Sequence, residues 1–172
     1  GAGLGGEPRI ALLRALTKIQ AQRLYQPDDA QASYEAILAA HPDDPEATAA
    51  LVQLFQQGEE WPSLLAIHSK QVAAEKDPDK RRDLLFRIAY IEEERIKDRP
   101  AAAATHAQIL AEDPSSARAM RALEKISQAR GDDAGLARAL ELQLGAATEV
   151  ETRVALELRL AALYEAPGKH HD

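Results

Sequence analysis

Few residues in this sequence have the type and spacing that catalysis or ligand binding requires. Gly1, Gly3 and Gly6 fit the pattern G-x-G-x-x-G, but this pattern binds a dinucleotide only where it joins a strand to a helix, and no strand-forming segment precedes it here. No two of the five histidines stand at i and i+4, the spacing with which H-E-x-x-H binds zinc. The sequence has no cysteine, which excludes a thiolate nucleophile and a cysteine-ligated metal.

The acidic pairs are placed to cap helices and not to act as catalytic dyads. Each pair lies where a helix is expected to begin, so its carboxylates can accept hydrogen bonds from free backbone N–H groups and face the positive end of the helix dipole. The pairs are Asp28–Asp29, Asp43–Asp44 and Asp132–Asp133. The sequence also lacks a G-x-S-x-G motif, a P-loop and a calcium loop. We therefore predict that this protein is not an enzyme and binds no cofactor and no metal.

Four arginines recur at a constant offset and leave two interpretations open. Arg81 and Arg87 reappear 72 residues later as Arg153 and Arg159. Such guanidinium groups can form ion pairs between neighbouring helices, or they can bind a partner's carboxylate through two parallel hydrogen bonds.

Composition favours tightly packed helices and excludes several classes of partner. The chain is 45% hydrophobic but only 4% aromatic, and alanine, the best helix former, is abundant. The 28 acidic residues outnumber the 21 basic ones, so the chain lacks the positive charge that nucleic-acid binding needs. No apolar run approaches the roughly 20 residues that span a membrane. We expect a bacterial protein that is cytoplasmic, or periplasmic if a signal sequence has been removed, with no nucleic-acid partner and no membrane insertion.

A repeat of 72 residues runs through the chain without a gap. Leu12 matches Leu84, Ile37 matches Ile109, and many further pairs coincide at the same offset. A third, partial copy begins at Arg153. Within each copy the apolar residues are three and four positions apart, which places them on one face of a helix. The repeat therefore consists of helices.

Breaker and capping residues divide each copy into helical hairpins. Prolines stand where helices can begin, and Gly58, Gly131 and Gly145 stand where they can end. We predict nine helices, over 8–24, 29–40, 45–57, 61–75, 79–97, 100–112, 116–130, 133–146 and 150–165. The short connections favour antiparallel neighbours.

The spacing within the second helix of each copy resembles the tetratricopeptide repeat. Small, bulky and closing residues follow one another as in that family's second helix; they are Ala30, Tyr34, Ile37 and Pro42, and again Ala102, His106, Ile109 and Pro114. Leu160, Ala161 and Tyr164 are similar to L-G-x-x-Y of the family's first helix, with alanine in place of glycine. The family's tryptophan is missing, and hairpins 45–75 and 116–146 match only loosely.

The resemblance implies an all-α, right-handed α-solenoid of stacked antiparallel helical hairpins. We expect one repeat domain over residues 8–165, composed of copies 9–80, 81–152 and a partial copy 153–165. Residues 1–7 are interpreted as a flexible leader or an expression scar, and residues 166–172 as a flexible tail. Helix 150–165 is a first helix without its partner, so it either caps the array or belongs to a longer one.

In this family the first helices of the hairpins line a concave groove that binds partners, and mapping by position gives candidate groove residues. They are Arg14, Lys18, Ala21, Thr48, Val52, Phe55, Phe86, Tyr90, Glu93, Leu158 and Ala162. A shift of one residue in the register would move any of them to the opposite face. We predict a non-catalytic scaffold that binds an extended or helical segment of a partner protein. The alternative is an architectural spacer of a larger repeat protein, in contact only with further repeats or with other copies of itself.

Overall fold

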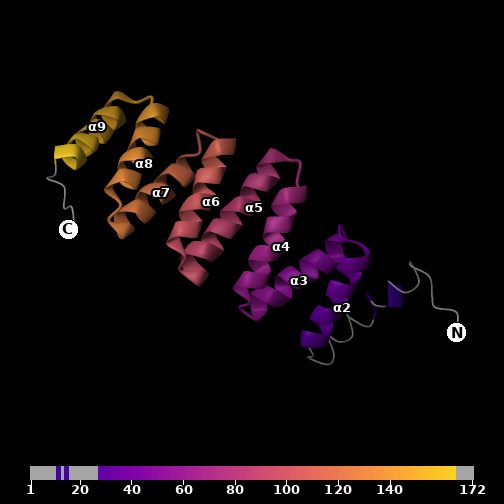
Figure 1. Cartoon of the computed structure of the whole chain (residues 1–172). Coiled ribbons are helices and arrows are strands. Elements are labelled where there is room, and N and C mark those ends of the chain that lie inside the picture. The colour runs from indigo at the N-terminus through magenta and orange to yellow at the C-terminus, as the bar shows by residue number, and fades with distance from the viewer. Residues whose placement is uncertain (1–10, 13, 16–26, 166–172) are drawn as a thin grey trace. The chain divides into compact units, whose positions relative to one another are not determined.

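The computed structural model describes residues 11–12, 14–15 and 27–165, and every regular element among them is helical. The α-helices follow one another along the chain as shown in Figure 1. They are α2 (Pro27–Ala40), α3 (Pro45–Gln57), α4 (Trp61–Ala74), α5 (Pro78–Tyr90), α6 (Arg99–Glu112), α7 (Ala117–Arg130), α8 (Asp133–Ala146) and α9 (Val150–Glu165). The predicted all-α fold is confirmed.

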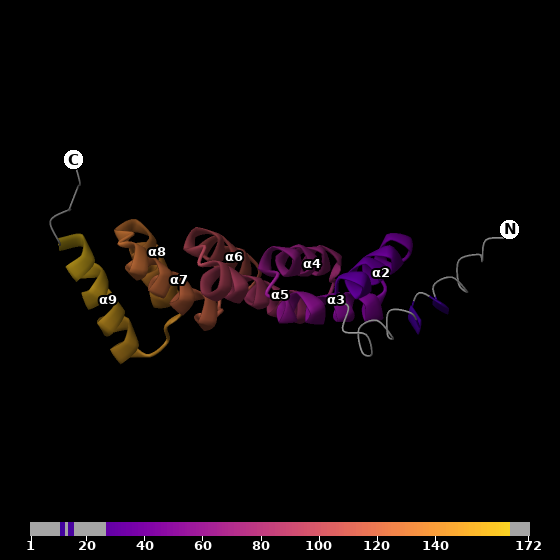
Figure 2. The same cartoon turned by 90° about the horizontal axis from the view of Figure 1, so that it is seen from below.

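The chain divides into two compact units between Lys70 and Gln71, within α4. In the first unit α2 packs against α3. In the second unit α5, α6, α7, α8 and α9 each pack against the next helix in the chain, a succession that can be followed in Figures 1 and 2. The expected single domain over 8–165 stays a prediction. Most of the expected helix 8–24 and the expected terminal segments 1–7 and 166–172 lie outside the described residues.

Local capping signals determine where the helices begin. Asp44 precedes α3 and its carboxylate accepts a hydrogen bond from the Ala47 amide at 2.9 Å, as expected of that acidic pair. Asp132 does the same for α8, with the Gly135 amide at 2.8 Å. The predicted bounds of α3, α8 and α9 agree with the structure, and those of α2, α4, α6 and α7 differ by one or two residues.

The 72-residue repeat is visible in individual backbone hydrogen bonds. The His41 amide donates to the Ile37 carbonyl at 2.7 Å, and Asp113 donates to Ile109 at 2.8 Å. In the turn after α3 the Glu60 amide donates to the Phe55 carbonyl at 2.8 Å. In the equivalent turn after α7 the Asp132 amide donates to the Ser127 carbonyl at 3.0 Å. The two copies therefore share backbone geometry as well as apolar pattern.

Three pairs of equivalent apolar positions are almost completely buried in both copies. Ala30 and Ala102 are both 0% exposed, as are Ile37 and Ile109. Ala47 and Ala119 are 1% and 0% exposed. Small buried residues at these points let neighbouring helices approach closely, which is the packing expected of stacked hairpins.

The expected helix 79–97 is not one regular α-helix. It is α-helical as α5 up to Tyr90 and continues as a π-helical segment, η2 (Ile91–Ile96). Lys97 then adopts a left-handed backbone conformation with φ 66°. The Asp98 amide donates a hydrogen bond to the Glu92 carbonyl at 2.8 Å, and the segment ends there. Thr105 of α6 donates a hydrogen bond to Glu92 Oε2 at 2.7 Å, so this segment is tied to α6 by a side chain.

Candidate partner-binding site

Three predicted groove residues of helix 79–97 come together around a hollow of the second unit. Phe86 and Tyr90 lie on α5 and Glu93 lies on η2. Together with residues of α6 and α7 they line a pocket of about 320 Å³, which we call the Phe86 pocket. Its lining residues are Phe86, Tyr90, Glu93, Glu94, His106, Arg118 and Ala122.

An arginine stacks on the aromatic ring at this pocket. The Arg118 Cζ atom lies 3.9 Å from the centroid of the Phe86 ring, a close cation–π contact. No carboxylate forms an ion pair with Arg118 among the described residues. The hydrogen-bond donors on the edge of its guanidinium group are therefore open to an outside acceptor.

His106 forms a buried wall of the same pocket. Its ring lies 6.1 Å from the Phe86 ring, centroid to centroid, and the residue is 5% exposed. Burial lowers the pKa of His106, Glu93 acts in the opposite direction, and Arg118 lowers it further. The net effect favours the neutral ring. Its Nδ1 atom has no hydrogen-bond partner among the described residues.

The two carboxylates of the pocket are held by lysines of the chain itself. Lys125 Nζ lies 2.8 Å from Glu93 Oε1 and 3.9 Å from Glu94 Oε1. Lys97 Nζ lies 3.2 Å from Glu94 Oε2. The hydrogen bond to Glu93 is the main reason why the pKa of Lys125 is raised. The negative charge of this wall is thus largely compensated, in contrast to the positive charge of Arg118.

The matching positions of the first copy contain a complete ion pair. Arg14 stands where Phe86 stands in the second copy, and Glu46 stands where Arg118 stands. Arg14 Nε lies 3.8 Å from Glu46 Oε2, and the same guanidinium also contacts Asp44. Tyr34 replaces His106, and its pKa is raised by burial and then by Glu46. The other predicted groove residues of the first helix, Lys18 and Ala21, lie outside the described residues.

One of the three residues predicted to face a partner on helix 45–57 is buried. Phe55 is 4% exposed and belongs to the core, so it presents no surface to a partner. Thr48 and Val52 are half-buried. They lie on the same side of α3 as Phe55, because the three residues are four and three positions apart. The α7 residues that do line the pocket, Arg118 and Ala122, correspond to Glu46 and Ala50. The pocket-lining positions of α7 are thus two residues earlier in the repeat than Thr48 and Val52, the positions predicted on α3.

On α9 the two predicted groove residues are exposed. Leu158 is 66% exposed and Ala162 is also exposed. They are the copies of Phe86 and Tyr90. On the other side of α9, Leu156 and Leu160 pack against Ala137 and Leu140 of α8. Leu158 therefore faces away from the contact with α8.

Of the recurring arginines, Arg81, Arg153 and Arg159 bind other parts of the chain. Arg81 Nε lies 3.0 Å from Glu112 Oε1, Arg153 donates to the Leu144 carbonyl at 3.3 Å, and Arg159 contacts Glu124. These contacts join different helices of the second unit, which favours the structural interpretation over partner binding for these three residues.

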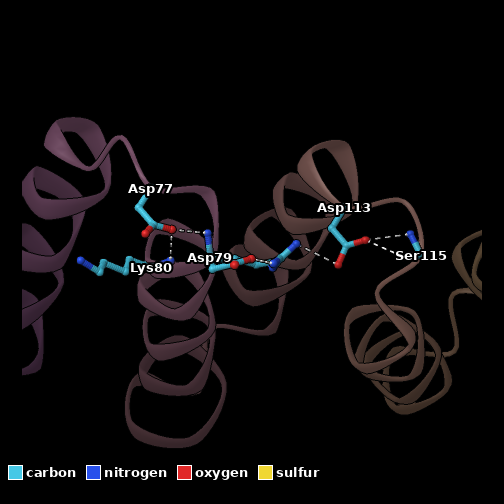
Figure 3. A network of polar contacts seen from close by, with 6 residues as sticks. Asp77, Asp79, Lys80, Asp113 and Ser115 are labelled. Atoms are coloured by element: carbon cyan, nitrogen blue, oxygen red, sulfur yellow. Dashed lines mark hydrogen bonds and ion pairs between the residues drawn. The ribbon is translucent and has the colours of Figure 1, made fainter.

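A related polar network joins the start of α5 to the loop after α6 (Figure 3). The Asp77 carboxylate caps α5 by accepting from the amides of Asp79 and Lys80 at 2.9 and 3.3 Å. Arg82 contacts Asp79 and lies 3.1 Å from Asp113 Oδ2. Hydrogen bonds from Ser115 lower the pKa of Asp113. The network therefore links α5 to the loop between α6 and α7, three helices that contribute to the Phe86 pocket.

The described residues contain no group of three or more histidine and carboxylate side chains that could hold a metal ion. No helix in the described part of the chain combines the length and apolar character that crossing a membrane requires.

Comparisons with known proteins connect this fold to solved structures. No protein-family model matches the chain, and no curated protein matches it. The crystal structure of MamA is similar over 91% of this chain and 83% of that chain, with a TM-score of 0.50 and 14% sequence identity. A thermophilic TPR protein in Thermus thermophilus aligns over 90% of this chain and 98% of its own, at 18% identity, but its TM-score of 0.32 is too low to carry an argument. The repeat pattern, the successive hairpins and the similarity to MamA show a tetratricopeptide-like, all-α repeat fold.

Proposed function

We propose that this chain is a non-catalytic protein–protein interaction scaffold that binds an extended or helical segment of a partner protein at the Phe86 pocket and the surface around it. One observation carries the proposal: Phe86, Tyr90 and Glu93, whose positions in the repeat predict them to be groove residues, line one pocket of about 320 Å³. Stacked helical hairpins typically present such surfaces to other chains. An exposed tyrosine beside a stacked arginine is also the composition enriched at interface hot spots.

Tyr90 is the residue best suited to test this proposal. It is 52% exposed, so its replacement should leave the core intact. With the full chain as bait in an extract of the source organism, we expect Tyr90→Ala to weaken capture of the partner protein about tenfold, since truncating a hot-spot aromatic costs about 1–2 kcal/mol.

A photo-crosslinking amino acid at position 90 locates the contact directly. The matched control places the same amino acid at Gln108, an exposed position of α6 that does not line the pocket. Crosslinks from position 90 and not from position 108 support the proposal. A partner that crosslinks equally from both positions, or whose capture is unaffected by Tyr90→Ala, would contradict it.

The second candidate function is that of an architectural spacer, and the surface of α9 favours it. Val154 is 48% exposed and Leu158 is 66% exposed on the same side of the helix. Ala161 is exposed although its copy Ala89 is 1% exposed. If this apolar face serves to pack against further hairpins or another copy of the chain, sedimentation velocity should detect self-association that Leu158→Asp abolishes. In that case no captured protein should depend on Tyr90.

A further inference from the structure

The two copies of the repeat differ in charge at one equivalent point. In the first copy a cation, Arg14, contacts an anion, Glu46, from the neighbouring hairpin. In the second copy the cation's position is taken by Phe86 and the anion's position by Arg118. In the second copy no described carboxylate forms an ion pair with the cation at this point, and Glu93 and Glu94 of the same pocket are paired with Lys125 and Lys97. The backbone turns around both points are nevertheless the same.

Arg118 is exposed, and no described carboxylate forms an ion pair with it. Its guanidinium stacks on the Phe86 ring at 3.9 Å, and stacking leaves the N–H groups on the edge of the plane free for two parallel hydrogen bonds. Arg118 is exposed and lines the pocket, so an acceptor can reach it from solvent. The chemistry that matches these donors best is a carboxylate.

A basic guest fits the same pocket poorly. The carboxylates that could attract it, Glu93 and Glu94, are already occupied by Lys125 and Lys97. The face of the Phe86 ring that could stack on it is occupied by Arg118. A lysine or arginine from outside would therefore have to displace these groups and would meet the positive charges of Lys125, Lys97 and Arg118.

We propose that the Phe86 pocket binds the side chain of an aspartate or glutamate in the partner segment, with Arg118 as the group that binds its carboxylate. This inference rests on the proposed function, because the acidic residue belongs to the protein that the scaffold holds. Tyr90 borders the contact and Ala122 leaves room for the acidic side chain beside Arg118.

The test uses the full chain and a short peptide of defined sequence. The probe is the blocked pentapeptide acetyl-Ala-Ala-Glu-Ala-Ala-amide, titrated at low salt and followed by NMR through the Arg118 and His106 side-chain signals. We expect saturable binding that is at least tenfold tighter than that of the same peptide with Gln or Lys in place of Glu. Blocked glutamate alone should bind several-fold more weakly than the pentapeptide, because the partner segment adds backbone and neighbouring contacts.

Two variants separate the role of Arg118 from a general effect of charge. Arg118→Gln should weaken binding of the Glu peptide about tenfold and remove its advantage over the Gln peptide. Arg121→Gln removes an exposed arginine of the same helix that does not line the pocket. It should change neither the affinity for the Glu peptide nor the advantage of that peptide over the Gln peptide. His106 gives a second readout: its pKa should rise when the Glu peptide binds, because the carboxylate offsets the charge of Arg118, which lowers that pKa in the free protein.

The outcomes distinguish this inference from the proposed function. If the Gln or Lys peptide binds as tightly as the Glu peptide, or if Arg118→Gln has no effect, the carboxylate inference is wrong even where Tyr90→Ala still weakens capture of a partner. If blocked glutamate binds as tightly as the pentapeptide, the pocket binds a small carboxylate and not a protein segment, which also overturns the inference.

Discussion

At the scale of single residues, Glu59 adopts a left-handed backbone conformation, and the equivalent residue of the second copy is a glycine. Glu59 has φ 55°, and its copy 72 residues later, Gly131, has φ 63°. Both close the end of a helix in equivalent hairpins, with amides that donate to Gln56 and Gln128 at 3.4 and 3.1 Å. Only glycine adopts this left-handed region without steric cost, because it has no Cβ atom.

We therefore expect Glu59→Gly to stabilise the protein and Gly131→Ala to destabilise it, each by about 1 kcal/mol. A Cβ atom at Gly131 would meet no other atom within 4 Å, so the cost there comes from the backbone alone. Urea unfolding measures both changes. Glu60→Gly is the control: its φ is not positive, so glycine should reduce stability there. A loss of stability in Glu59→Gly would contradict the interpretation.

At the scale of elements, the apolar contact of α9 with α8 is one narrow stripe, beside the polar contacts that Arg153 and Arg159 make with the second unit. Leu156 and Leu160 are 6% and 8% exposed and pack on Ala137 and Leu140 of α8. The opposite side of α9, with Leu158, is exposed. The stability of this helix in the unit should therefore depend on few side chains.

Leu156→Ala is expected to lower the free energy of unfolding by about 2–5 kcal/mol, since it removes buried methyl groups and leaves a cavity. Leu158→Ala, two residues away on the exposed side, should change it by less than about 0.5 kcal/mol. Denaturant unfolding gives the values, and hydrogen exchange of the α9 amides shows whether the helix opens on its own. Equal effects of the two substitutions would mean that the packing face has been assigned incorrectly.

At the scale of the whole molecule, the joints between helices share a set of carboxylates whose charged form is favoured. The pKa of Asp44 is lowered chiefly by the hydrogen bond from the Ala47 amide, and that of Asp113 by Ser115. For Glu124, burial opposes ionisation, but hydrogen bonds from Arg159 and Gln143 still lower the pKa. These groups lie in both units, so acid should affect the whole chain.

We expect stability to fall as the pH decreases below about 4.5 towards the lowered pKa values of these carboxylates. In this range the unfolded chain binds protons that the folded chain does not, because the ordinary values are 3.8 and 4.5. His106 adds a loss that begins below pH 6.5, since burial lowers its folded pKa too. Glu92 acts against this trend because its pKa is raised by burial. Urea unfolding at a series of pH values measures the net change in the free energy of unfolding. Asp113→Asn should make that free energy depend less on pH in the acid range. Stability that rises with acid would contradict the assignment.

Much of the architecture follows from local signals in the sequence. Asp44 followed by Pro45, and Asp132 followed by an apolar period of three and four residues, determine where α3 and α8 begin whatever lies around them. The 72-residue offset placed Ala30 with Ala102 and Ile37 with Ile109, and these pairs are equally buried. The positions of Phe86, Tyr90 and Glu93 in the repeat were also sufficient to bring them together at one pocket.

Only the tertiary structure decided which apolar residues of a helix face the core and which charges are already paired. Phe55 and Phe86 are both aromatic residues on amphipathic helices, yet Phe55 is buried and Phe86 lines a pocket, because periodicity defines a stripe but not the neighbour that covers it. Arg14 and Arg118 are equally basic in the sequence, but Arg14 contacts Asp44 and Glu46 and Arg118 stacks on Phe86. That difference depends on side chains from separate helices, and the sequence of one helix does not contain it.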